Sequence, residues 1–159
     1  MSARIDDIDG ELLRALLEDG RASASDLAEA ADVATSTATK RLARLEDEGV
    51  IERYQPAVDY SAFGYDVTAV FRLDVEGEGL ADVVEGLRET GRMIGVYEVT
   101  GSDDVVAIGK FASTDEMNAQ IKDLVTHEHV RSATTDIVLD AVCEYEPPPV
   151  RTTDDSGAT

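Results

Sequence analysis

The sequence predicts an α+β protein in which an N-terminal winged helix-turn-helix precedes a ferredoxin-like βαββαβ sandwich. Two observations lead to this prediction. Apolar residues recur with helical spacing in three successive segments over roughly the first third of the chain. Farther on, segments with apolar residues at every second position alternate with helical segments in the order βαββαβ. We therefore expect domains at 1–60 and 61–146, followed by a tail at 147–159.

Polar cap residues mark the start of the first two helices. Asp9 is the expected N-cap of the first helix, which Gly20 ends. Ser23 is the expected N-cap of a short second helix, because its hydroxyl can accept hydrogen bonds from the amides of the next turn. Asp26 stands at the capping-box position, three residues later. The second helix therefore has a complete start signal.

The third helix, expected from Thr35 to Glu48, has one apolar face and one face rich in basic and hydroxyl side chains. In a helix-turn-helix the second helix of the pair enters the major groove, where arginine can bind guanine and hydroxyls can hold phosphates. We therefore expect double-stranded DNA to bind Thr35, Ser36, Thr37, Lys40, Arg41, Arg44 and Arg53.

The basic face of this helix has a simpler explanation, since charged faces on ordinary helices are common. However, four of the 14 basic residues of the chain fall in this helix or just after it. The sequence offers no structural reason for such a group. It also precedes a predicted wing, a short hairpin formed by 50–54 and 57–59 around Pro56. This position favours the DNA-binding interpretation.

The second part of the chain contains four predicted strands and two predicted helices. The strands are expected at 67–75, 93–100, 105–111 and 130–146. One helix is expected from Leu80 to about Gly91, and another begins at Thr114 as its cap. The tail after 146 is polar and contains three consecutive prolines, so we expect it to be disordered.

The formal net charge is −20, from 34 acidic and 14 basic residues. Lysine is scarce, with only Lys40, Lys110 and Lys122. A domain this acidic repels itself in dilute buffer, and molar salt screens that repulsion. We therefore expect the protein of an extreme halophile, a haloarchaeon; an acidic protein adapted to ordinary salt is the alternative.

The sequence also indicates a compartment. No stretch approaches the roughly 18 consecutive apolar residues that a membrane span needs. The charged start, with Arg4, Asp6 and Asp7, is unlike a secretory signal. Cys143 is the one cysteine, which excludes an internal disulfide and fits a reducing environment. We expect a soluble, cytoplasmic protein with no membrane partner.

Several short stretches in a fixed order carry a resemblance to a known family. They are 5–9 with Leu13, Gly20–Arg21, 23–28, 41–46, 49–51 and 99–104. Together they resemble the Lrp/AsnC family of leucine-responsive and asparagine-operon regulators over about 4–146. The resemblance implies a DNA-binding transcriptional regulator that dimerises through its C-terminal sheets, often assembles further, and binds an amino acid near subunit interfaces. Ala34 departs from the pattern, since many relatives have a serine cap there, and this leaves Thr35 as the expected N-cap of the third helix.

A candidate effector site lies in the turn at 100–104. Its glycine lets backbone amides approach a carboxylate, and its aspartates can accept hydrogen bonds from an ammonium group. The expected residues are Thr100, Gly101, Ser102, Asp103 and Asp104, with Thr134 and Asp136 on an opposing segment. A plain β-turn explains the same composition, and both interpretations stay open.

Two other classes of function are alternatives to a regulator that responds to an effector. One is a nucleoid-type DNA-binding protein with no effector, and the other is an enzyme, since siroheme decarboxylases resemble this family. His127, His129 and Cys143 could suggest a metal site, but their spacing argues against one. No Ser-His-Asp or Cys-His pattern and no phosphate-binding glycine loop occurs. We therefore expect a regulator without catalytic activity, metal or cofactor.

Overall fold

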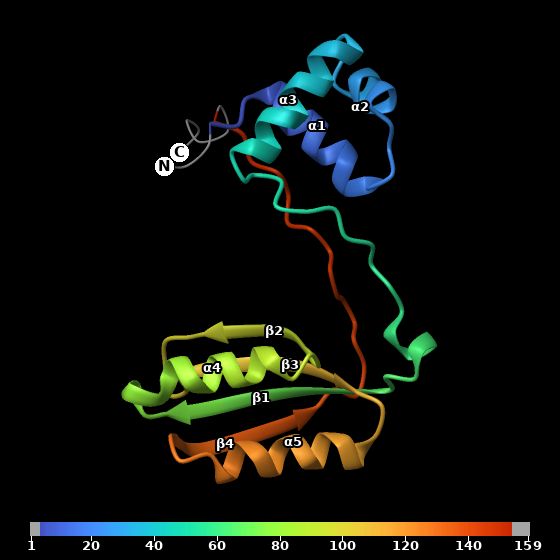
Figure 1. Cartoon of the computed structure of the whole chain (residues 1–159). Helices are drawn as coiled ribbons and strands as arrows, with labels where there is room; N and C mark the ends of the chain where they lie inside the picture. Colours follow the sequence, from blue (N-terminus) through green and yellow to red (C-terminus); the bar gives the residue numbers. More distant parts are fainter. Residues whose placement is uncertain (1–3, 154–159) are drawn as a thin grey trace. The chain divides into compact units, whose positions relative to one another are not determined.

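A computed structural model describes residues 4–153 and divides the chain into two compact units (Figure 1). The first unit contains residues up to Ala57 together with the segment that begins at Cys143, and the second runs from Val58 to Val142. No helix in the described part of the chain is both long and apolar enough to cross a membrane.

The first unit is a three-helix domain. Its helices are α1 (Asp7–Glu18), α2 (Ala24–Ala30) and α3 (Thr35–Asp47). Leu12, Leu27 and Ala38 are buried together, one from each helix. Ser23 caps α2 and forms the expected capping box with Asp26. The pair α2 and α3, joined by a tight connection, forms the predicted helix-turn-helix.

Two other caps differ from the predictions. Asp6, not Asp9, caps α1, and its side chain accepts a hydrogen bond from the Asp9 amide at 2.9 Å. Asp9 therefore lies inside the first turn, where it is fully buried. The N-cap of α3 is Ala34, which makes no side-chain cap. Thr35 is already helical, so the prediction that it caps α3 is wrong.

The predicted wing hairpin is also absent between Val50 and Asp59, where the structure contains no strand. The amides of Val50 and Ile51 instead donate to the Leu45 carbonyl, at 2.8 and 3.0 Å, and so close the end of α3. Beyond them the chain is exposed, and Pro56 has no N–H to donate to a ladder. The apolar pattern of the sequence predicted strands here, but such a pattern does not show whether a second strand is present to pair with them.

The second unit is the predicted ferredoxin-like sandwich. Its elements are η1 (Tyr60–Phe63), β1 (Val67–Val75), η2 (Gly77–Gly79), α4 (Leu80–Glu89), β2 (Met93–Glu98), β3 (Val105–Phe111), α5 (Thr114–Thr126) and β4 (Val130–Ile137). The four strands form one antiparallel sheet in the order β2-β3-β1-β4. Ser113, rather than the expected Thr114, caps α5 by accepting from the Glu116 amide.

Both helices of the second unit pack on one face of the sheet. Alternate residues of β1, such as Phe71 and Leu73, are fully buried with Leu87 of α4 and Leu124 of α5. Residues at the intervening positions lie on the opposite face, where Val70 pairs with Ile108. Most side chains on that face are part-buried or exposed, although Lys110 of β3 is only 9% exposed. The sheet therefore has one covered face and one open face.

The last strand is shorter than predicted. It ends at Ile137, and the Val138 amide donates to Thr68 near the start of β1. Because β1 begins at Val67, the chain beyond Val138 has no strand on which to pair. Leu139 is accordingly 99% exposed, and the prediction of a strand to Glu146 is wrong.

The described part of the tail is held by the first unit. The Thr153 amide donates to the Ile5 carbonyl at 2.9 Å, and the Thr152 hydroxyl donates to Asp7 at 3.0 Å. Arg14 donates to the Val150 carbonyl at 3.3 Å. In Figure 1 the red segment accordingly ends beside the blue start of the chain. The expectation of disorder does not hold for these residues, while 154–159 lie outside the described part.

Candidate nucleic-acid interface

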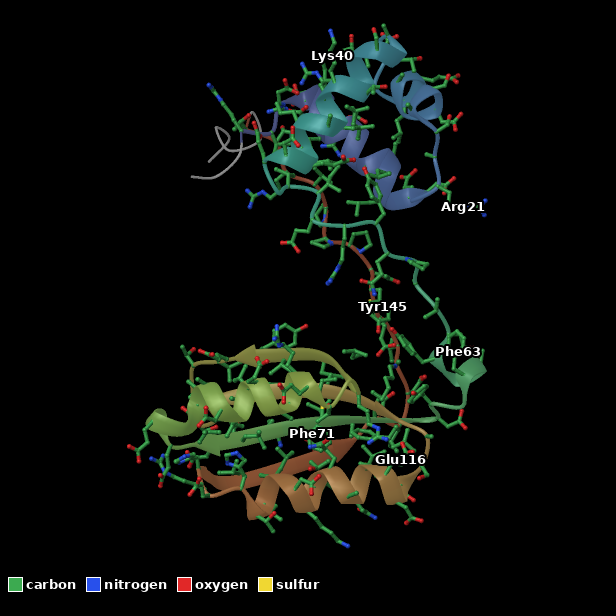
Figure 2. All side chains as sticks on the ribbon, viewed as in Figure 1. Arg21, Lys40, Phe63, Phe71, Glu116 and Tyr145 are labelled. Carbon is green, nitrogen blue, oxygen red and sulfur yellow. The ribbon has the colours of Figure 1, made fainter. Side chains whose placement is uncertain are left out.

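A hollow on the first unit lies between the start of α1 and the basic face of α3. It is lined by Arg4, Asp6, Asp9, Thr37, Lys40, Arg41, Arg44 and Thr153. Four of the residues predicted to bind DNA therefore meet at one surface. Lys40 is exposed and projects away from the helices of this unit (Figure 2).

The other three predicted DNA-binding residues lie outside the hollow. Thr35 and Ser36 are exposed in the first turn of α3. Arg53 is exposed in the segment that follows α3. Of the seven expected residues, the structure thus brings four together on α3. Two others lie in the first turn of α3, and Arg53 lies beyond its end.

Arg41 and Arg44 both bind the buried carboxylate of Asp9. Arg41 Nη1 lies 2.9 Å from Asp9 Oδ1, and Arg44 Nη2 lies 2.5 Å from Asp9 Oδ2. Arg41 also binds Asp6 at 2.7 Å. The side chain of Asp9 is only 1% exposed, so its charge needs these partners. The two arginines therefore have a structural role, and the inference that no structural reason groups them is wrong.

Hydrogen bonds within these ion pairs shift the pKa of Asp6, Arg41 and Arg44 in the direction that favours the charged form. Hydrogen bonds to Asp6 and then to Asp9 raise the pKa of Arg41, and a hydrogen bond to Asp9 raises the pKa of Arg44. The Asp9 amide and the Arg41 guanidinium lower the pKa of Asp6. The hollow thus holds four cationic side chains against two carboxylates. It is locally positive in a chain whose net charge is −20.

Arg4 is not among the DNA-binding residues predicted from the sequence. It lies before α1 and joins the hollow only because α1 packs against α3. The sequence did contain a pattern that predicts the ion pairs. Asp6 and Asp9 are three residues apart, as are Arg41 and Arg44. Equal spacing of opposite charges on two neighbouring helices is what allows them to pair.

The candidate effector turn connects β2 and β3. Gly101 has φ +135°, which favours glycine, and Ser102 donates to Asp103 at 3.2 Å. The Asp104 carboxylate accepts a hydrogen bond from the Val75 amide at 2.8 Å, and its own amide donates to Leu73 at 2.8 Å. Asp104 therefore ties the turn to the end of β1.

The two expected residues on β4 lie at different distances from this turn. Thr134 pairs with Arg72, next to the Leu73 position that the turn contacts. Asp136 pairs with Val70, farther along β1, and its carboxylate lies 3.1 Å from the Arg72 guanidinium. Within a single chain, Thr134 therefore lies toward the turn, whereas Asp136 lies farther along β1 and forms an ion pair with Arg72.

A helix-turn-helix with a positive hollow, followed by a ferredoxin-like domain, defines a DNA-binding regulator of two domains. Comparison with known families agrees. Residues 5–52 match a family described as winged helix-turn-helix DNA-binding, and residues 68–148 match the Lrp/AsnC ligand binding domain. The chain belongs to the Lrp/AsnC family of transcriptional regulators.

Its relatives include archaeal regulators. An HTH-type transcriptional regulator of Pyrococcus horikoshii is 32% identical over 140 residues, which cover 88% of this chain and 95% of the relative. The HTH-type transcriptional regulator FL11 of Pyrococcus furiosus is 28% identical over 151 residues, covering 95% and 100%.

Solved structures share the fold. The feast or famine regulatory protein of M. tuberculosis, solved in complex with L-methionine, has a TM-score of 0.83 and 26% identity, covering 92% of this chain and 99% of that one. A transcriptional regulator of Neisseria meningitidis has a TM-score of 0.82 at 22% identity, covering 87% and 92%.

Proposed function

We propose that this regulator binds operator DNA through the hollow on α3 and acts in the cytoplasm. The observation that supports this most is the group of four cationic side chains around α3 in a strongly acidic chain. Lys40 and Arg4 are the proposed phosphate contacts, because neither has an ion pair within residues 4–153. Arg41 and Arg44 add positive charge to the same surface, and their ion pairs with Asp9 hold their side chains in place.

The test compares two lysines. Lys40→Ala removes a charge from the hollow, and Lys122→Ala removes the same charge from α5 in the other unit. We expect K40A to weaken operator binding and to reduce the salt slope by about 0.9, the value for one lost phosphate contact. K122A keeps wild-type affinity, and both variants keep the wild-type circular dichroism spectrum. Equal affinities for the two variants would contradict the proposal.

The effector of this proposal is an amino acid, bound at the turn of residues 100–104. Support comes from the turn chemistry and from the L-methionine complex of the M. tuberculosis relative. Calorimetry with L-methionine and other amino acids tests this assignment. We expect Gly101→Val to abolish the binding heat, because its φ of +135° does not suit a branched side chain. Unchanged binding would remove the turn from the site.

A homodimer is the proposed assembly, formed through the open face of the sheet. Val70 and Ile108 form an apolar pair there, and Tyr97 next to them is 55% exposed. We expect Val70→Asp to shift the mass measured by light scattering toward the monomer. Val125→Asp is the control, because Val125 is 54% exposed on α5. A dimer unaffected by V70D would contradict this assembly.

One observation favours a second candidate, a DNA-binding protein with no effector. The Asp104 carboxylate is already used by the Val75 amide, as in a structural turn. The two candidates differ in operator affinity with and without amino-acid mixtures. We propose no catalytic activity, in agreement with the regulators to which the chain is similar.

A further inference from the structure

Three side chains with metal-binding atoms meet at one end of the sandwich. Glu76 follows β1, Glu78 lies in η2, and His129 precedes β4. One potential ligand atom from each lies within 4.8 Å of the other two. Ligands that share one ion at bonds of about 2.1 Å are roughly 3.4 Å apart in tetrahedral geometry. The exposed side chain of Glu78 can close the remaining gap by rotation.

The backbone holds two of these residues in place. The Glu76 amide donates to the His129 carbonyl at 2.9 Å, and the Gly79 amide donates to the Glu76 carbonyl at 2.9 Å. The imidazole of His129 fills the space beside Gly79, where a Cβ would lie 2.0 Å from the ring. The His129 side chain is accordingly only 23% exposed. Its position is therefore fixed without any ion.

The potential ligand atoms are close to charged groups but not hydrogen-bonded to them. His129 Nδ1 lies 3.8 Å from Glu76 Oε2, and Arg131 Nε lies 3.9 Å from Glu76 Oε1. Arg131 is closer to Asp74, at 3.0 Å. No hydrogen bond or ion pair engages the Glu78 carboxylate within residues 4–153. No hydrogen bond therefore stops the two carboxylates from turning toward an ion beside the fixed imidazole of His129.

We propose that Glu76, Glu78 and His129 form a binding site for a divalent transition-metal ion of the zinc class. One imidazole and two carboxylates are a donor set that Zn²⁺ and Co²⁺ accept, whereas Ca²⁺ and Mg²⁺ prefer oxygen ligands alone. Three protein ligands leave a fourth position for water. The site lies in the second unit and is independent of the DNA-binding proposal.

His127 supplies a matched control. Its Nδ1 accepts the amide proton of His129 at 3.3 Å, but His127 does not belong to the metal-binding cluster. Its ring centroid is only 5.8 Å from that of His129. If the two neighbouring imidazoles simply bound the ion together, as in a histidine tag, the affinity would depend on both histidines. Of these two histidines, the proposed site uses only His129.

The experiment titrates the untagged full chain with Co²⁺ in molar KCl and follows the visible absorption of the bound ion, with Zn²⁺ as competitor. We expect one ion per chain, with an affinity that His129→Gln and Glu78→Gln each lower at least tenfold. His127→Gln and Asp123→Asn, an equal loss of charge on α5, keep wild-type affinity. E78Q alters an exposed side chain, so folding of this variant is not in question.

Three results would overturn the proposal. They are binding that E78Q and H129Q do not weaken, equal losses in H127Q and H129Q, and weak uptake of several ions per chain by all variants. The last result would mean that the ions bind to the acidic surface in general.

Discussion

Arg44 of α3 and Asp9 of α1 form a direct ion pair, with Nη2 2.5 Å from Oδ2. Asp9 is 35 positions earlier in the chain and is fully buried. The same carboxylate also binds Arg41, so one acidic group joins the first helix to two basic residues of the proposed DNA-binding helix. The proposed DNA-binding surface and the stability of the unit therefore share residues.

Asp9→Asn should destabilise the first unit by about 1–3 kcal/mol, because the neutral amide no longer balances two guanidinium groups. Chemical unfolding in molar KCl measures this change. Glu11→Gln is the control, since Glu11 forms a half-exposed pair with Arg14 and its loss should cost under about 0.5 kcal/mol. Equal stability of the two variants would show that the buried carboxylate does not hold α1 to α3.

Gly10→Ala should interfere with docking of the tail, since its Cβ would lie 2.6 Å from Thr152 Cγ2. Thr152→Ser removes that methyl group and keeps the hydroxyl that binds Asp7. In the T152S background G10A should therefore stabilise the helix by up to about 1 kcal/mol, the ordinary gain of alanine over glycine. In the wild-type background the gain should be lost. Thermal unfolding of the four proteins measures the coupling, and purely additive effects would mean that the tail does not dock there.

Acid should selectively weaken the contribution of Asp6. Its pKa in the folded chain lies below the ordinary value of 3.8, because the Asp9 amide and then Arg41 favour the carboxylate. Its contribution is therefore fully present above the pKa of the unfolded chain and is lost as the pH falls through the folded pKa. The stability difference between wild type and Asp6→Asn should shrink below about pH 4. Urea unfolding from pH 6 to 3 measures it, and a constant difference would contradict the assignment.

Potassium chloride should stabilise the whole chain. A net charge of −20 opposes the compact state, and the screening length falls from about 10 Å at 0.1 M to about 3 Å at 1 M. Operator affinity should also depend weakly on salt, because cation uptake by acidic patches near the DNA opposes the usual cation release. Circular dichroism and an affinity titration, run in parallel, separate the two effects. A steep loss of affinity in a chain already folded at about 0.1 M would contradict both expectations.

Much of the fold could be predicted from local patterns. The alternation along 67–75 and the stripe from Leu80 to Leu87 each predict an element whose buried face is visible in the sequence. Ser23 with Asp26 predicts the start of α2 for the same reason, because a capping box involves residues only three apart. The group of basic residues on α3 was likewise visible, and most of it meets in one hollow.

By itself, therefore, the sequence determined the three N-terminal helices, the βαββαβ order of the second unit, the family, and the face of α3 that carries positive charge. Only the tertiary structure decided that Asp9 is buried between Arg41 and Arg44, that β4 ends where β1 begins, and that Thr152 packs against Gly10. The physical reason is the same in each case. Elements follow from interactions within a few residues, whereas a buried charge, a strand end or a docked tail depends on a partner far away in the chain.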